Sequence, residues 1–294
     1  MTTASNSHTK SLGDIFDNAF RLYRRHFLRL STIAIIVGMP MLVVQGLVSY
    51  WLLPRFSIGL IWLTSFFSNL AITLIFDNLL NAVLVVAVAL AYHNQTISIG
   101  AAYRTAFQRY PLLVLASIIP LLAERIFNWI VSILQTPLTI LAVSGSSFGM
   151  ANGGMLLFLG AVLALPIGLV LLAVYSQLFL YVQASVLEAR GPIDALARSW
   201  RLLEGGRWRG ILLVLLTRLL GYFFTSLPWL LFTFVFFQLT DARQLFPAAS
   251  LIVMLLALLI VAPLVNAIYT LFYYAVRERS EGYDLERHLA RVTS

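Results

Sequence analysis

Long uncharged stretches constrain this chain more than any other feature. Residues Ile126–Leu187 form a run of 62 positions without Asp, Glu, Lys or Arg, and Gln244–Val276 also contains none. Phe56–Tyr103 contains a single charge, Asp77. Only 11% of the whole chain is charged, against about a quarter of an ordinary soluble domain. A water-soluble fold is therefore excluded, and we expect an all-α integral membrane protein.

The uncharged stretches divide into six segments that are long enough to be membrane-spanning helices. A helix needs about 20 apolar residues to cross the hydrocarbon core. The predicted spans are residues 30–53, 67–92, 111–133, 155–187, 210–236 and 249–276. We expect one polytopic membrane domain over residues 1–294, which ends in a polar tail at residues 277–294.

The basic residues predict the orientation of this domain. Sixteen of the 20 Lys and Arg residues fall before the first, third and fifth spans or after the sixth, whereas only Arg55 and Arg243 fall on the other side. Cytoplasmic loops carry such an excess of Lys and Arg. We therefore predict that both termini are cytoplasmic.

Three segments on the predicted cytoplasmic side share one helical pattern. They are residues 11–27, 98–110 and 191–208. In alignment, their apolar residues recur at i, i+1, i+4, i+5 and i+8, which is one face of an α-helix. The aligned columns are Ile15/Ala102/Ala195, Phe16/Tyr103/Leu196, Ala19/Ala106/Ser199, Phe20/Phe107/Trp200 and Tyr23/Tyr110/Leu203. Each segment precedes two predicted spans, so the chain is predicted to contain three repeats, at about 11–92, 98–187 and 191–276.

Local signals agree with helices in these segments. Ser11 and Ser98 are predicted N-caps, and Pro192 suits a first helical turn. On the polar face, Asp194 and Arg198 are spaced for a favourable i,i+4 ion pair.

An amphipathic helix with aromatic and arginine side chains is typical of the membrane interface, where guanidinium groups meet lipid phosphates. A structural collar that packs on the ends of the spans explains the same pattern. The predicted partners are anionic phospholipid headgroups; a protein partner is not identifiable, and nucleic acid is not expected. The candidate interface residues are Arg21, Arg24, Arg104, Arg109, Arg198, Trp200, Arg201, Arg207, Trp208 and Arg209.

Two motifs carry a family likeness. Residues 185–216, SVLEARGPIDALARSWRLLEGGRWRGILLVLL, together with residues 11–27, SLGDIFDNAFRLYRRHF, resemble the membrane domain of bacterial glycerophosphoryl diester phosphodiesterases. The resemblance implies six helices in a bacterial inner membrane. It implies no catalytic role, because in that family the chemistry belongs to a separate soluble barrel. We expect the membrane domain here without that barrel.

Signals for catalysis are missing from the sequence. The chain has no Cys and four scattered His residues, and it contains no zinc-binding HExxH, nucleophile elbow or phosphate-binding loop. We therefore predict a protein that is not an enzyme and needs no metal or cofactor.

Polar residues inside the spans are the remaining candidates for activity, because each ionisable group costs roughly 2.5–3.5 kcal/mol at the centre of a membrane helix. Two acids and two bases permit pairing of Asp77 with Arg125 and of Glu124 with Arg218. The candidates are Asp77, Asn81, Glu124, Arg125, Asn128 and Arg218.

The preferred interpretation is a non-enzymatic scaffold or lipid-associated membrane protein, linked to phospholipid or envelope metabolism by the resemblance alone. A transporter or channel for a small polar or lipid-like solute is the alternative, and a lipid-modifying enzyme is a third hypothesis. A polar cavity that reaches the intramembrane residues from one side favours transport, whereas a dry, fully paired core favours scaffolding.

Overall fold

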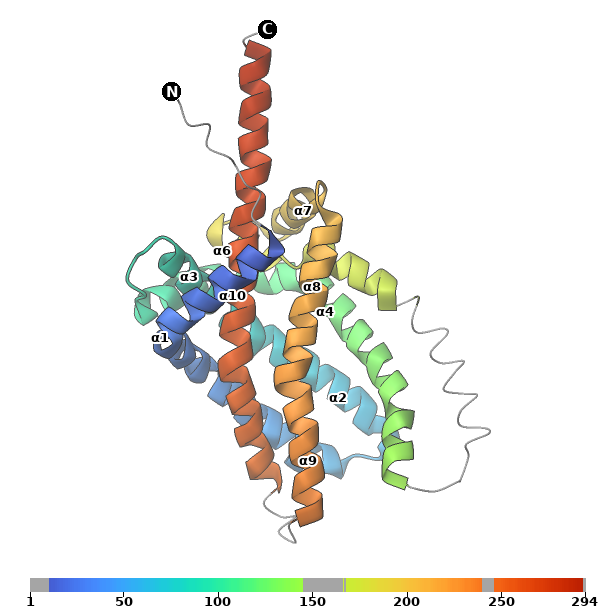
Figure 1. Cartoon of the computed structure of the whole chain (residues 1–294). Coiled ribbons are helices and arrows are strands. Elements are labelled where there is room, and N and C mark those ends of the chain that lie inside the picture. The colour runs from blue at the N-terminus through green and yellow to red at the C-terminus, as the bar shows by residue number, and fades with distance from the viewer. Residues whose placement is uncertain (1–10, 145–165, 167, 240–245, 293–294) are drawn as a thin grey trace.

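The computed structural model describes residues 11–144, 166, 168–239 and 246–292 (Figure 1). Every secondary-structure element in these ranges is helical. Six helical segments are long and apolar enough to cross a membrane, and each overlaps a predicted span. They are Leu12–Leu52, Leu63–Tyr92, Ile99–Ile126, Gly168–Leu187, Arg207–Trp229 and Ala249–Glu281, numbered here as spans 1 to 6. The predictions of an all-helical fold and of six helices long and apolar enough to span a membrane are confirmed for the described residues.

Span 1 consists of α1 (Leu12–Gly46) and the π-helical η1 (Leu47–Leu52). Ser11 caps α1 as predicted: its hydroxyl accepts from the Asp14 backbone N–H at 3.1 Å, and the Asp14 carboxylate accepts from the Ser11 backbone N–H at 2.9 Å. The backbone of α1 leaves helical values at His26 (φ −116°, ψ 18°). The predicted amphipathic segment and the span are therefore two helices that meet at a kink.

The second amphipathic segment continues without interruption into span 3. Both belong to α4 (Ile99–Ser144), and the hydroxyl of Ser98 accepts from the backbone N–H of Ala101 at 3.4 Å, as expected for an N-cap. Span 2, which precedes them, has three parts: α2 (Ile58–Ile72), which begins before the span, the π-helical η3 (Thr73–Asp77) and α3 (Asn78–Tyr92). The 3₁₀ turn η2 (Leu53–Arg55) precedes α2.

The third amphipathic segment is a separate helix, α7 (Pro192–Leu203), which has Pro192 in its first turn as predicted. We call residues 11–27, 98–110 and 191–203 the collar helices. Span 4 contains helical residues 168–178 and α6 (Tyr181–Leu187). Span 5 contains α8 (Arg207–Gly221), η4 (Tyr222–Ser226) and the start of α9 (Leu227–Leu239). Span 6 lies within α10 (Phe246–Val292).

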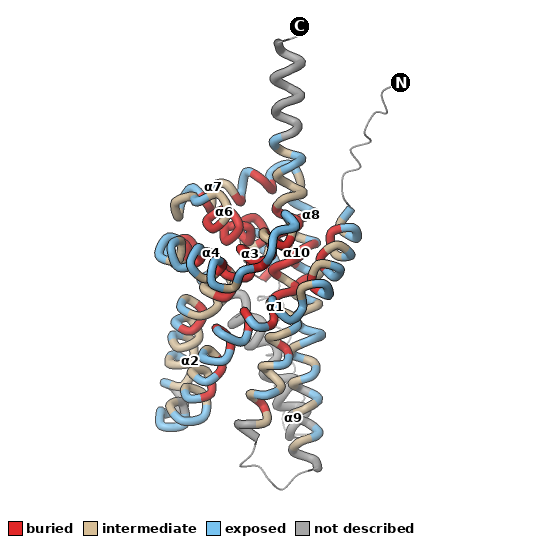
Figure 2. The backbone as a smooth tube through the Cα atoms, turned by 90° about the vertical axis from the view of Figure 1, so that its left-hand side faces the viewer, coloured by how far each residue is buried: buried red, intermediate tan, exposed pale blue. Residues whose placement is uncertain are grey.

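Spans 2, 4 and 6 pack together in the half of the molecule that carries the collar helices. In this half α3 contacts both α6 and α10, and α1 packs along α10. We call this half the collar half, at the top of Figure 1, and the half that contains residues 53–57 the opposite half. Buried residues concentrate in the collar half, as the red segments of Figure 2 show. Its largest fully buried side chains include Leu84, Leu180, Ile268, Phe272 and Tyr273.

The opposite half is much less enclosed. Apolar side chains of the three even-numbered spans are exposed there, and pale blue and tan dominate this part of Figure 2. The exposed residues include Leu63 and Phe67 on span 2, Leu169 and Val170 on span 4, and Ile252 and Leu256 on span 6. The even-numbered spans are therefore packed more closely in the collar half than in the opposite half.

Candidate functional site

Asp77 and Arg218, two of the ionisable residues predicted inside the membrane, lie near the middle of spans 2 and 5. Arg218 is eleven residues from the start of α8 at Arg207, and Asp77 is fifteen from the end of α3 at Tyr92. At 1.5 Å per residue these separations are about 17 and 22 Å, and the hydrocarbon core is about 30 Å thick. We call the polar groups at this level the midspan cluster. Its members are Thr73, Asp77, Glu124, Arg125, Tyr175 and Arg218.

Glu124 and Arg218 form an ion pair between spans 3 and 5. Arg218 Nη2 donates to Glu124 Oε1 at 2.7 Å, which confirms the predicted pairing. The guanidinium carbon of Arg218 also lies 5.0 Å from the centroid of the Tyr175 ring on span 4, within cation–π range. The two charged side chains are 36% and 19% exposed, so the pair borders accessible space and is not sealed in the core.

Arg125 and Asp77 meet through Thr73. Arg125 Nη2 donates to the Thr73 hydroxyl, which also contacts the Asp77 carboxylate. Within the part of the chain that the structure describes, no direct ion pair joins Asp77 to Arg125, so this predicted contact is wrong in detail. The reason is local: Thr73 and Asp77 begin and end the π-helical turn η3, and Thr73 offers the nearer acceptor. Single π turns of this kind occur frequently at functional sites.

Asparagine side chains join the central spans. Asn78 donates to the Ser117 hydroxyl at 2.7 Å, and the Tyr181 hydroxyl donates to the Asn78 amide oxygen at 3.3 Å. The candidate Asn81 accepts from Asn266 Nδ2 at 2.9 Å and so connects spans 2 and 6. Because such bonds between spans fix how helices associate, we assign the asparagines a structural role.

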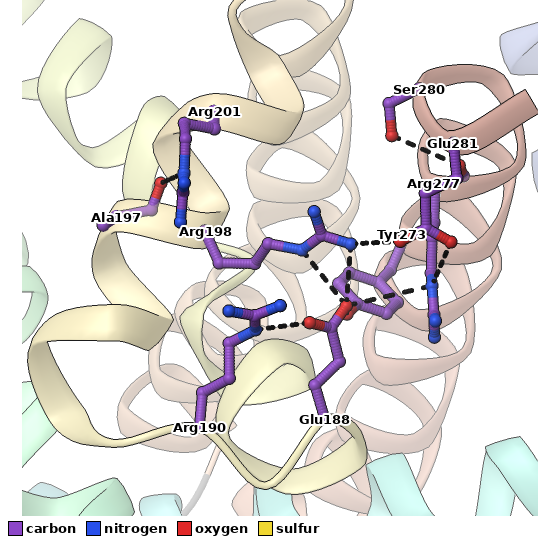
Figure 3. A network of polar contacts seen from close by, with 9 residues as sticks. All are labelled: Glu188, Arg190, Ala197, Arg198, Arg201, Tyr273, Arg277, Ser280 and Glu281. Atoms are coloured by element: carbon purple, nitrogen blue, oxygen red, sulfur yellow. Dashed lines mark hydrogen bonds and ion pairs between the residues drawn. The ribbon is translucent and has the colours of Figure 1, made fainter. Parts of the chain in front are cut away.

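A second polar network lies where span 4 ends (Figure 3). The Glu188 carboxylate, only 9% exposed, accepts from Arg190 Nε at 2.5 Å and from Arg198 at 3.2 Å. Tyr273 of α10 also donates to it, and Arg277 lies 3.9 Å away. Glu188 therefore connects the end of span 4, the collar helix α7 and the end of span 6.

The hydrogen bonds determine the charge state of Glu188. Burial raises the pKa of this carboxyl, but hydrogen bonds from Tyr273, Arg190 and Arg198 outweigh burial and leave its pKa below the usual range. Glu188 is therefore an anion at neutral pH. Burial lowers the pKa of the Arg198 guanidinium, but its hydrogen bonds to Glu281 and Glu188 and their negative charges outweigh burial and leave that pKa raised.

This network was not predicted from the sequence, although one signal for it was present. Glu188 is the first charge after the run of 62 uncharged residues, and Arg190 follows within the motif that carries the family likeness. Its partners Tyr273 and Arg277 are more than 80 residues away, and spacing does not identify such pairs. The predicted Asp194–Arg198 ion pair is absent among the described residues, because the side chain of Arg198 reaches Glu188 and Glu281 instead.

Most candidate interface residues lie on the surface of the collar half. Two of them are not exposed: Arg198 is 17% exposed and bonded to Glu188, and Arg109 is half-buried. Trp208 is 80% exposed, and the Arg207 guanidinium lies 5.8 Å from the centroid of the Trp200 ring. The exposed members of the set are Arg21, Arg24, Arg104, Trp200, Arg201, Arg207, Trp208 and Arg209.

Known proteins and metal chemistry add no further assignment. No family model, curated protein or solved structure matches the chain. Among the described residues, no group of three or more His, Asp or Glu side chains is placed to hold a metal ion. Asn128, the last intramembrane candidate, lies on α4, but its side chain is outside those the structure describes.

Proposed function

We propose that the chain is a non-enzymatic bacterial inner-membrane protein whose collar helices bind anionic phospholipid headgroups on the cytoplasmic side, as a scaffold or interaction domain. One observation carries this proposal. Each collar helix buries one face against the spans and leaves an aromatic ring exposed beside arginines, namely Phe20 (39% exposed), Phe107 (56%) and Trp200 (41%). Exposed aromatic rings and guanidinium groups suit the boundary between acyl chains and phosphates. A link to phospholipid or envelope metabolism rests on the family likeness alone.

The burial of the collar helices supports a threefold repeat. Residues 11–20, 98–107 and 191–200, aligned as in the sequence, have the same degree of burial at eight of ten positions. Ala19, Ala106 and Ser199 occupy one column, and all three are fully buried. Spans 2 and 4 also end alike, since Asn94 (φ 55°) and Ala189 (φ 56°) both take the left-handed conformation just after the helix.

The contacts of the collar helices supply a second argument for repeats. Tyr23 donates to the Leu259 carbonyl of span 6, and Tyr110 donates to the Ile75 carbonyl of span 2. The Ser199 hydroxyl donates to the Gln177 carbonyl of span 4. Each collar helix thus bonds to the second span of the preceding repeat, and the first repeat bonds to the last. This is the pattern of a ring of three similar units around an axis along the membrane normal.

Lipid binding by the collar is tested with the full-length protein in nanodiscs or detergent. Native mass spectrometry counts bound phosphatidylglycerol in the wild type, in the double variant Arg21→Gln/Arg24→Gln, and in the control Arg55→Gln. Each arginine near the surface contributes about 1 kcal/mol, so the double variant is expected to bind the anionic lipid roughly tenfold to thirtyfold more weakly. Equal binding by all three proteins contradicts the proposal.

A solute transporter is the second candidate function, and the one-sided burial favours it. The collar half is closely packed, apolar side chains are exposed in the opposite half, and Arg218 of the midspan cluster is 36% exposed. Binding sites near the bilayer midplane with access from one side are typical of secondary transporters.

A further inference from the structure

On span 4, the midspan cluster lies where buried residues give way to exposed ones. On its collar side, Ser176 and Tyr181 of span 4 are 0% and 5% exposed. Towards the opposite half, Val174 and Val170 of the same span are 36% and 63% exposed. Exposed apolar side chains therefore begin within one or two turns of Tyr175, whose ring contacts Arg218. The cluster therefore lies between buried polar residues and exposed apolar residues of span 4.

The formal charges of the midspan cluster balance. Asp77 and Glu124 contribute two formal negative charges, and Arg125 and Arg218 contribute two positive charges. A purely anionic ligand that engaged an arginine would displace a carboxylate and leave it without its partner in a medium where an unpaired charge is costly. A ligand with one negative and one positive group keeps every charge paired.

Hydrogen-bonding capacity is left over on both arginines. A guanidinium has five N–H donors. Among the described residues, the guanidinium of Arg218 donates one hydrogen bond, to Glu124, and that of Arg125 donates one, to Thr73. Within the described residues, Nε of Arg125 is buried and has no partner. Buried donors normally have acceptors, so a ligand that supplies an acceptor would satisfy this N–H of Arg125.

We propose that the midspan cluster binds a zwitterionic amphiphile, a phospholipid with an amine-bearing headgroup, that enters through the opposite half. Arg125 and Arg218 hold the phosphate, Asp77 and Glu124 hold the ammonium, and the acyl chains lie along the exposed apolar residues of span 4. The inference deepens the second candidate function by naming the ligand of the same site, and it is independent of lipid binding at the collar.

The test measures binding of phosphatidylethanolamine and phosphatidylglycerol to the purified full-length protein by native mass spectrometry. Free phosphoethanolamine is included as a competitor without acyl chains. Variants Arg218→Gln and Arg125→Gln remove one donor set each, Arg218→Lys keeps the charge without the planar fork, and Arg279→Gln is an exposed control remote from the cluster. Hydrogen bonds to charged groups predict phosphatidylethanolamine binding roughly tenfold to hundredfold weaker in both glutamine variants, and unchanged binding in the control.

Three results overturn the inference. The first is that Arg218→Gln and Arg125→Gln bind phosphatidylethanolamine as tightly as the wild type, and the second is that they lose phosphatidylglycerol binding to the same extent. The third is that free phosphoethanolamine fully displaces phosphatidylethanolamine, which assigns the site to a water-soluble zwitterion. If Arg218→Gln does not fold, the phosphatidylethanolamine binding of Arg125→Gln and Arg218→Lys decides between these outcomes. Lipid movement between leaflets is measured separately in proteoliposomes, so absence of transport removes the second candidate function and leaves the binding result intact.

Discussion

Replacing Glu188 by alanine is expected to destabilise the collar half strongly. The carboxylate is 9% exposed and accepts hydrogen bonds from Arg190, Arg198 and Tyr273. Tyr273 is fully buried, so its hydroxyl loses its acceptor without gaining water. The variant therefore leaves a buried donor and a largely buried guanidinium without their shared anion.

The size of the effect follows from these contacts. A buried donor left unsatisfied costs about 1–3 kcal/mol, and breaking a buried ion pair costs about 3–5 kcal/mol. Arg190 is 36% exposed, and Arg198 keeps its contact with Glu281, so part of the loss is recovered. We expect the free energy of unfolding to fall by about 3 kcal/mol.

Glu281→Ala is the matched control, because it removes a carboxylate from the same network. Glu281 is 45% exposed and pairs with Arg198 and Arg277, and exposed pairs contribute about 0–1 kcal/mol. Reversible denaturant unfolding in detergent micelles, followed by circular dichroism, measures both variants. Equal losses in the two proteins, or a loss below about 1 kcal/mol for Glu188→Ala, refute the reasoning.

Three further predictions follow from the same structure. Because the folded-state pKa of Glu188 is depressed, its stabilisation is present at neutral pH and is lost as the pH falls through the acidic range; wild-type thermal stability should drop there more than that of Glu188→Gln. Glu124→Arg and Arg218→Glu should each lower the yield of folded protein on size-exclusion chromatography, and the double swap should restore it; absence of rescue rejects the pair. Ala106→Leu should destabilise the protein by about 1–3 kcal/mol through overpacking of a fully buried position, whereas Ala101→Leu on the exposed face of the same helix should change stability little in the same unfolding assay.

The fold was predictable from the sequence because its signals are strong and local. The long uncharged stretches locate the spans. Ser11 and Pro192 mark helix starts, because the Ser11 side chain caps the helix and proline fits a first helical turn. The kink at His26 agrees with the predicted end of the first amphipathic segment at residue 27. The uninterrupted α4 was not predicted, since nothing in the sequence distinguishes a continuous helix from two helices that meet at an angle.

The candidate site was predictable only in part. Charge balance identified Glu124 and Arg218 as partners, because few ionisable residues occur inside the spans and each needs an opposite charge. The route from Arg125 to Asp77 through Thr73 depends on a π turn that has no sequence signal. The Glu188 network depends on contacts across long sequence separations, which only the packing of spans 4 and 6 reveals.

The central claim is that the collar half faces the cytoplasm, and labelling of introduced cysteines tests it most directly. The chain has no Cys, and a side chain added at Gly100 or Gly205 meets no atom within 4 Å, so Gly100→Cys and Gly205→Cys are well tolerated sites. Ser57→Cys, exposed in the opposite half, is the counterpart. With a membrane-impermeant maleimide on intact cells, the account predicts labelling of Ser57→Cys alone, and labelling of the two glycine variants only after permeabilisation. Labelling of Gly100→Cys or Gly205→Cys in intact cells contradicts it.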